Sequence, residues 1–162
     1  MTEPPRPDSC SVHFTVYGKP VGARFRVVMV RAHGMLAQEP ASKLYARTVS
    51  AAARDALKQQ GWVKPARDVP LILHLAMWCP MPTSWSKKAQ TAHWGGLAVT
   101  APDTDNYVKL FSDACLGVRL APRTHEGIVF DDDRQVAGLA ITRRWCMAGE
   151  ARVEATVELA KE

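Results

Sequence analysis

Short stretches in which apolar and polar residues alternate run through this chain, and alternation is the pattern of half-buried β-strands. Residues 11–17 carry Val12, Phe14 and Val16 on one side, and after a break at Gly18, residues 25–31 predict a partner strand. Residues 71–79 are almost wholly apolar, which is typical of a buried central strand. Two further strands are predicted at 135–144 and 152–159, joined by a hairpin turn near residues 148–149.

Two stretches instead repeat their apolar residues at helical spacing. In residues 41–60 the repeat of Leu44, Thr48, Ala52 and Ala56, flanked by Tyr45, Val49 and Leu57, predicts a buried face. Ser42 is the predicted N-cap and Gly61 the predicted end. In residues 103–116 the predicted buried face consists of Tyr107, Val108, Phe111, Ala114 and Cys115. The mixture of strands and helices predicts an α+β fold, a single domain with a mixed β-sheet and two main helices packed on it.

Two segments lack a clear period. Residues 1–10 are proline-rich and predict a flexible tail, which leaves 11–162 as the folded domain. Residues 80–102 contain no acidic side chain, and a loop of that length inside a domain is usually functional or disordered. It contains Trp85 and Trp94, which are candidates to stack on nucleic-acid bases or to pack in a core or dimer interface.

Charge is distributed unevenly along the 162 residues, whose net charge is +5. Residues 9–102 hold twelve Lys or Arg against three acids, whereas residues 103–162 hold eight against eleven. This asymmetry suits a protein that holds a polyanion against bound cations. On charge alone, however, solvated charge that maintains solubility is the better explanation. The chain lacks a transmembrane stretch and a signal peptide, and its four cysteines lack a zinc spacing, so we expect a soluble cytoplasmic protein with mostly buried thiols.

The acidic residues of the second half gather in two clusters. Asp103 and Asp105 open the predicted helix, and Asp131, Asp132 and Asp133 precede a predicted strand. If the clusters converge, two like charges 4 Å apart repel by about 4 kcal/mol at an effective dielectric constant near 20. A divalent cation among them would relieve this repulsion, and Lys109, one turn after Asp105, would contact a phosphate or steady the carboxylates.

Each of these features also has an ordinary structural explanation. Residues 100–103 resemble a helix capping box, residues 131–133 suit a solvated turn, and Lys109 with Asp113 suits a surface ion pair. Together these explanations account less well for two acidic clusters after ninety residues that nearly lack acids. An EF-hand, a P-loop, a GxGxxG loop and an HExxH motif are all absent.

The sequence resembles the RusA family of Holliday junction resolvases. The residues that carry the resemblance are Pro102-Asp103-x-Asp105-Asn106-x-x-Lys109, Asp113-Ala114, Gly117 and Asp132-Asp133-x-Gln135-Val136. Weaker matches are Gly18-x-Pro20, Arg24-x-Arg26, Pro82-x-Ser84-Trp85-Ser86-Lys87-Lys88 and Arg143-Arg144-Trp145. The order and spacing of the two acidic motifs in a basic chain are specific, whereas either motif alone is weak.

The resemblance implies a homodimer that binds branched DNA, such as a four-way junction, and cuts it symmetrically with Mg²⁺ or Mn²⁺ and no nucleotide cofactor. It gives catalytic roles to Asp103, Asp105, Asp133 and Lys109 and a metal-binding role to the three aspartates, with Asp132 as an additional ligand. Asp131 makes a triple acid where the family usually has a pair, so the register of this cluster stays open.

The basic residues near these motifs are candidates for contacts with the DNA backbone, and each is also explained as a solvated surface charge. They are Arg24, Arg26, Lys87, Lys88, Arg143 and Arg144. Two other functions remain open at this point. One is a nucleic-acid-binding module without catalysis, and the other is a different metal-dependent hydrolase of phosphate esters.

Overall fold

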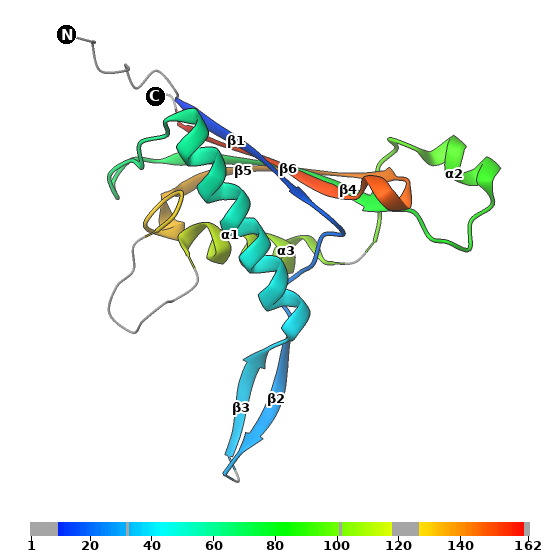
Figure 1. Ribbon diagram of the computed structural model, residues 1–162, viewed down its shortest axis with the longest axis horizontal. Coiled ribbons are helices and arrows are strands. Elements are labelled where there is room, and N and C mark those ends of the chain that lie inside the picture. Colours follow the sequence, from blue (N-terminus) through cyan, green and yellow to red (C-terminus); the bar gives the residue numbers. More distant parts are fainter. Residues whose placement is uncertain (1–9, 32, 101, 118–126, 161–162) are drawn as a thin grey trace.

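A four-stranded mixed sheet with two long helices on one face forms the body of the protein (Figure 1). The structure is a computed structural model, and it describes residues 10–31, 33–100, 102–117 and 127–160. The expected tail at 1–10 lies outside this description except for its last residue. The elements are β1 (Ser11–Tyr17), β2 (Phe25–Val30), β3 (His33–Gln38), α1 (Pro40–Gln60), β4 (Leu71–Pro80), α2 (Lys87–His93), α3 (Thr104–Leu116), η1 (Asp133–Gln135), β5 (Val136–Cys146), η2 (Ala148–Glu150) and β6 (Arg152–Leu159).

The main sheet has the strand order β1-β6-β4-β5. Strand β4 is central, as its apolar sequence predicts, and it pairs antiparallel with β6 and parallel with β5. The predicted hairpin between the last two strands is wrong, because β4 lies between them. Instead the chain passes over the end of β4 through η2, and the Met81 N–H donates to the Cys146 carbonyl there.

One face of the sheet is buried under α1 and α3. Strand β1 places Val12, Phe14 and Val16 on this face, and the ring of Phe14 stacks on Phe111 of α3 with 5.8 Å between the centroids. The hydroxyls of Tyr45 on α1 and Tyr107 on α3 are hydrogen-bonded at 3.0 Å, which joins the two helices inside the core. The predicted fold class, a mixed sheet with two main helices on it, is therefore confirmed within the described chain.

Strand β2 differs most from the sequence prediction. It pairs with β3, a strand that the sequence analysis missed, and the two form a separate two-stranded sheet. The expected partner of β2, strand β1, pairs with β6 instead.

The outer edge of β1 is covered at His13 by the side chain of Gln60, whose amide bonds to both the N–H and the carbonyl of His13. A side chain in this position blocks the edge against pairing with another strand.

The predicted buried face of α1 is confirmed in part. Tyr45, Val49 and Ala56 are buried as predicted, whereas Leu44 is 67% exposed. Ala53, which the prediction did not include, is also buried. Helix α1 begins at Pro40 with Glu39 as its N-cap, so the predicted cap, Ser42, is free for another role. The helix ends with Gly61 as its C-cap, as predicted.

Three further observations complete the fold. The thiols of Cys79, Cys115 and Cys146 are free and buried, in agreement with their predicted packing, and that of Cys10 is exposed. The segment 80–102 contains the short helix α2. Within the residues described, no helix has the length and apolar character needed to cross a membrane.

Ser42 joins α1 to the segment that follows β1. Its hydroxyl is fully buried, donates to the Gly22 carbonyl at 2.8 Å and accepts from the Arg24 N–H at 3.2 Å. We expect Ser42→Ala to lower the free energy of unfolding by about 1–3 kcal/mol, because two buried backbone groups lose their partner. Urea denaturation measures this loss. Ser84→Ala, at an exposed serine, is the control, and an equal effect of both changes contradicts the assignment.

Candidate active site

The first turn of α3 is held against the segment that leads from β1 to β2. The Ala23 N–H donates to the Asn106 carbonyl at 2.9 Å. Gly22 lies so close to the helix that a Cβ atom there would be 2.7 Å from the Cβ of Pro102. The contact therefore requires glycine, and it brings the start of β2 to the N-terminus of α3.

Arg143 supports the residues that lead into α3 from the other side. Its Nη1 donates to the carbonyls of Thr100 at 2.8 Å and Pro102 at 3.0 Å. The sequence analysis treats this arginine as a contact for DNA. In the structure its half-buried side chain positions the backbone immediately before Asp103, and its contact with DNA stays a prediction.

Asp103 and Asp105 extend from this anchored turn into solvent. Asp103 is the N-cap of α3, yet its side chain accepts no capping hydrogen bond. Both residues are exposed, and neither forms an ion pair with another described residue. The capping explanation for the first acidic cluster is therefore wrong for Asp103, because an N-cap aspartate stabilises a helix by accepting backbone N–H groups.

Lys109 and Arg24 lie beside these carboxylates. Lys109 follows Asp105 by one helical turn, and its Nζ lies 5.7 Å from the ring centroid of Phe25, the first residue of β2. Arg24 lines a cleft of about 90 Å³ together with Asp103 and Asn106. A cleft of this size suits a phosphate group, since pockets for whole nucleotide-sized ligands are several-fold larger.

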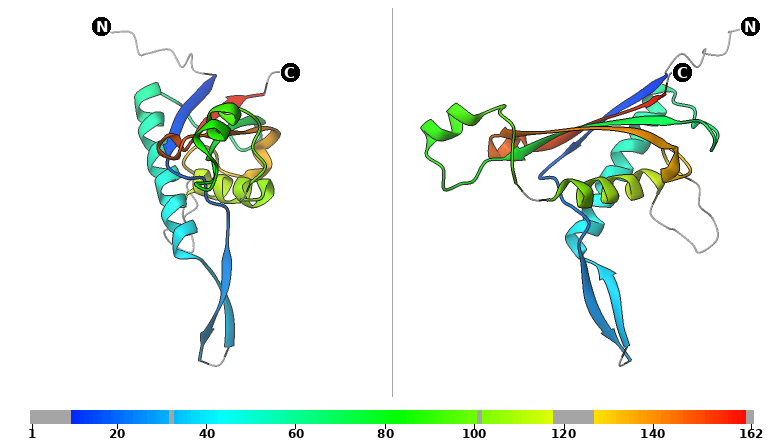
Figure 2. Two further views of the ribbon diagram at one scale, coloured as in Figure 1. Left: turned by 90° about the vertical axis from the view of Figure 1, so that its right-hand side faces the viewer. Right: turned by 180° about the vertical axis from the view of Figure 1, so that it is seen from behind.

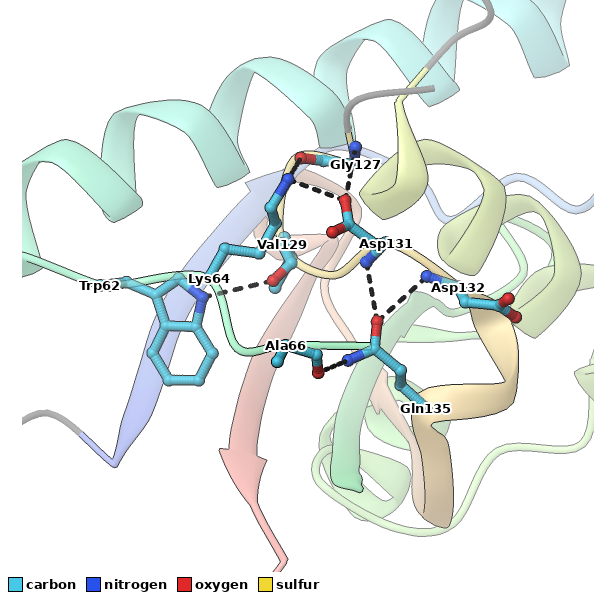
Figure 3. Close-up of polar contacts among 8 residues, drawn as sticks. All are labelled: Trp62, Lys64, Ala66, Gly127, Val129, Asp131, Asp132 and Gln135. Carbon is cyan, nitrogen blue, oxygen red and sulfur yellow. Dashed lines mark hydrogen bonds and ion pairs between the residues drawn. The ribbon is translucent and has the colours of Figure 1, made fainter. Parts of the chain in front are cut away.

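Asp131, in the second cluster, is occupied by structural contacts (Figure 3). Its Oδ1 accepts from Lys64 Nζ at 2.7 Å and from the Gly127 N–H at 3.1 Å, and Lys64 also donates to the Gly127 carbonyl. The Lys64 ammonium holds the pKa of this carboxyl below its usual range. The turn is so tight that a Cβ atom on Gly127 would overlap the Phe130 carbonyl oxygen.

Gln135 holds the backbone of the second acidic cluster in place. Its side chain is buried, and its Oε1 accepts from the N–H groups of both Asp131 and Asp132. Its Nε2 donates to the carbonyls of Ala66 at 2.9 Å and Val69 at 3.3 Å. The glutamine of the Asp-Asp-x-Gln motif thus connects the second acidic cluster to the loop after α1.

Asp132 and Asp133 differ from Asp131 and from each other. Asp132 points away from Lys64 and Gln135 (Figure 3), caps η1 by accepting the Arg134 N–H, and pairs with the Arg134 guanidinium at 2.6 Å. That guanidinium lowers the pKa of Asp132. Asp133 lies in η1, is exposed, and forms no ion pair with another described residue. Of the three acids, Asp131 is thus engaged by Lys64 and the Gly127 N–H, Asp132 is engaged by Arg134, and Asp133 is exposed.

Within the described part of the chain, the two acidic clusters do not come together in one metal-binding site. No three His, Cys, Asp or Glu side chains among those residues lie close enough together to hold a metal ion. Helix α3 separates the clusters, because Asp103 is at its N-terminus whereas the Ile128 and Val129 N–H groups donate to the carbonyl of Cys115 near its other end. Both figures of the whole chain show the orange η1 turn near the C-terminal end of α3.

The remaining basic candidates are spread over three places. Arg26 is exposed on β2, and Lys87 and Lys88 are exposed at the start of α2, which projects beyond the end of β4 (Figure 1). Arg144 is exposed on β5, and its Nη1 donates to the Gly95 carbonyl. Of the two tryptophans, Trp85 packs between His93 and Trp145, whereas Trp94 is 52% exposed and donates to Glu150.

The sequence analysis did not predict the roles of Lys64, which binds Asp131, and of Ser42, which bonds to the backbone of Gly22 and Arg24. Lys64 stands in a polar loop after α1, where a lysine is usually a solvated charge, and nothing local connects it to an aspartate 67 positions later. The alternation of residues 25–31 did indicate a strand. The contact of Phe25 with Lys109, however, depends on where the β2–β3 ribbon, the two-stranded sheet of residues 25–38, lies relative to α3. Only tertiary contacts reveal these roles.

The ion pair of Lys64 with Asp131 provides a test of this segment. We expect Lys64→Met to lower the free energy of unfolding by about 1–3 kcal/mol, because a part-buried carboxylate and the Gly127 carbonyl lose a charged donor. Arg134→Met is the matched control: the Arg134 side chain is 87% exposed, so we expect no measurable loss. Chemical denaturation of both variants measures the difference, and equal stabilities contradict the structural role of Asp131.

Gly22 provides a test of the contact with α3. We expect Gly22→Ala to lower the free energy of unfolding by about 1–3 kcal/mol, because the added methyl group forces the first turn of α3 away from the segment. Gly149→Ala is the control, since a Cβ atom there meets nothing within 4 Å. Thermal and urea unfolding of the two variants measure this difference. Unchanged stability of the Gly22 variant would show that the contact is not close in solution.

Comparison with known families identifies the family of this chain. The model of the family described as endodeoxyribonuclease RusA matches residues 18–158, which includes both acidic clusters, Lys109 and the β2–β3 ribbon. A search of curated proteins gave no match. Since the family match covers most of the 162 residues, the chain belongs to the RusA endodeoxyribonuclease family.

Proposed function

We propose that this endodeoxyribonuclease resolves four-way DNA junctions by a metal-dependent reaction that cuts two strands symmetrically. Family membership supports endonuclease action on junctions, and the finer statements are our proposal. The observation that carries it is the pair of exposed carboxylates, Asp103 and Asp105, on an anchored helix N-terminus beside Lys109 and Arg24. Carboxylates held in this way, without partners of their own, are available for ligation.

The residues at the start of α3 fit a hard divalent cation. Mg²⁺ takes oxygen ligands and usually binds through one or two carboxylates, with water and substrate phosphate in its other positions. Asp103 and Asp105 are therefore a sufficient protein set for Mg²⁺ or Mn²⁺, with water and a DNA phosphate in the other positions. Asp133, the third predicted ligand, lies beyond the other end of α3 from Asp103, so it does not complete this set within one chain.

When bound, the cation would lower the pKa of a bound water and neutralise charge on the phosphate. The protein's own contribution is positional. Lys109 presents its ammonium on the same helical face as Asp105, where it stabilises negative charge that develops on the phosphate. Arg24, at the small cleft with Asp103, orients the phosphodiester, and Arg143 keeps the backbone before Asp103 in place.

We propose a homodimer as the active form. Cutting two strands of a junction symmetrically requires two active sites related by two-fold symmetry, and each chain has one such helix N-terminus. Arg26, Lys87, Lys88 and Arg144 are exposed and would contact the DNA backbone away from the reacting phosphate. A separate phosphate-ester hydrolase is not favoured, because the family to which the chain belongs is described as an endodeoxyribonuclease.

The role of Asp105 is tested by Asp105→Asn. We expect the variant to bind a synthetic four-way junction as tightly as wild type and to cut it on the order of a hundredfold more slowly with Mg²⁺, because a charged ligand is lost while the shape is kept. Cleavage rates and a binding titration with a chelator present separate the two effects.

Asp55→Asn, at an exposed acid of α1, is the matched control and should cut at the wild-type rate. Added Mg²⁺ should raise the melting temperature of the wild type and of the control more than that of the Asp105 variant. A variant that lacks the Asp105 charge and still cuts at full rate would falsify the assignment of the metal site.

A further inference from the structure

The β2–β3 ribbon projects away from the body of the protein, as Figure 1 and both views of Figure 2 show. Its two strands are paired only with each other in the described chain, from Phe25 opposite Gln38 to Val30 opposite His33. An isolated two-stranded hairpin is marginally stable at best in water. A ribbon of this kind is therefore expected to gain stability from a partner that covers one of its faces.

One face of the ribbon is apolar and open. Val27 and Met29 of β2 share this face with Leu36, which lies directly opposite Val27, and these three side chains are 67%, 67% and 75% exposed. Gly34 lies opposite Met29. Because glycine has no side chain, the side chains of Val27 and Met29 occupy the space above Gly34. Exposed apolar groups that share one face mark a binding surface more often than scattered ones do.

The charge of the ribbon restricts what this surface can bind. Residues 18–38 contain four basic side chains, Lys19, Arg24, Arg26 and Arg31, and no acidic one. Arg31 stands in the turn at the tip, is exposed, and has a φ of 48°, a left-handed conformation that turn sequences usually assign to Gly or Asn. An arginine at this position places a positive charge at the point farthest from the body.

The base of the ribbon is continuous with the candidate active site. The ring of Phe25 lies under the ammonium of Lys109, and Arg24 lines the cleft that contains Asp103. A DNA strand whose phosphate lies at Asp103 would therefore pass directly alongside the ribbon.

We propose that the β2–β3 ribbon inserts into the open centre of a DNA junction, with Val27, Met29 and Leu36 packed against unstacked bases and the ribbon's arginines on the flanking phosphates. The inference rests on the proposed function and deepens it by naming the element that recognises the branch. Apolar side chains of this type are used as wedges between base steps, and a two-stranded ribbon has the width to enter a major groove.

Charge favours DNA over a second copy of the chain as the occupant. Two ribbons packed together would combine four arginines, Arg26 and Arg31 of each copy, with no acidic side chain between residues 25 and 38 of either. DNA instead brings a phosphate charge to each arginine and offers bases to the apolar face. Bases are most accessible at a branch point, where stacking is interrupted.

The test uses the full-length protein with Val27, Met29 and Leu36 all changed to Thr, which removes the apolar face and keeps a residue that favours strands. The DNA is a four-way junction with 2-aminopurine beside the branch point, and a linear duplex of the same length serves as reference. We expect the triple variant to bind the junction about tenfold or more weakly, while its affinity for the duplex changes by less than about twofold. The rise in 2-aminopurine fluorescence seen with wild type should be lost.

Two controls separate the apolar face from charge and from surface polarity. Leu44→Gln with Val63→Thr changes two exposed apolar residues outside the ribbon and should leave both binding and fluorescence unchanged. Arg26→Gln should reduce the dependence of log affinity on log salt by about one unit of slope, whereas the triple Thr variant should leave that slope unchanged.

The outcomes of these experiments distinguish the role of the ribbon from the proposed function. A triple variant that binds and unstacks the junction like wild type, or that loses equal affinity for junction and duplex, overturns the role of the ribbon. A change of sedimentation from dimer to monomer in the triple variant also overturns it and assigns the face to a second copy. If wild type binds and unstacks the junction but does not cut it with Mg²⁺, the proposed function fails and the ribbon assignment stands; if wild type neither binds nor cuts, both fail.

Discussion

The contact between residues 22–24 and the first turn of α3 is the constraint on which the rest of the site depends. The backbones approach so closely at Gly22 that no side chain fits, and the Ala23 N–H and the Ser42 hydroxyl bond the segment to α3 and α1. One small region therefore sets the position of Asp103, Lys109 and the root of the β2–β3 ribbon. Since α3 is itself buried against the sheet, these groups have a rigid support.

The aspartates of the two clusters fall into two groups, those that have a cationic partner and those that have none, and their spacing in the sequence does not predict which group each belongs to. Asp131 is bound to Lys64 and a backbone N–H, and Asp132 is bound to Arg134. A carboxylate that already has a cationic partner gains less from a metal ion than one that has none. This leaves three exposed acids without a cationic partner among the described residues: Asp103 and Asp105 at one end of α3, and Asp133 near the other. Repulsion between the clusters is limited, because α3 holds them at opposite ends of its length.

The open form of the site agrees with a protein that acts on a large polyanion. A substrate of this kind supplies its own phosphate oxygens and binds over a wide area, so the protein need not enclose it. The basic side chains are accordingly spread over the ribbon, α2 and β5, while the cleft at Asp103 is small. Membership of the RusA endodeoxyribonuclease family is consistent with this division between a broad binding surface and a local reacting centre.

The sequence by itself determined the elements that depend on local pattern: the strands at 11–17, 71–79 and 152–159, the helix that begins after Asp103, and the Asp-x-Asp and Asp-Asp-x-Gln motifs that resemble the family. Periodicity decides which residues of an element are buried, but it carries no information on which element lies beside it. Only the tertiary structure decided that β2 pairs with β3, that Lys64 binds Asp131, and that Arg143 supports the turn before Asp103. These contacts join residues from 3 to 67 positions apart, and their partners are selected by the packing of the whole sheet and its two helices.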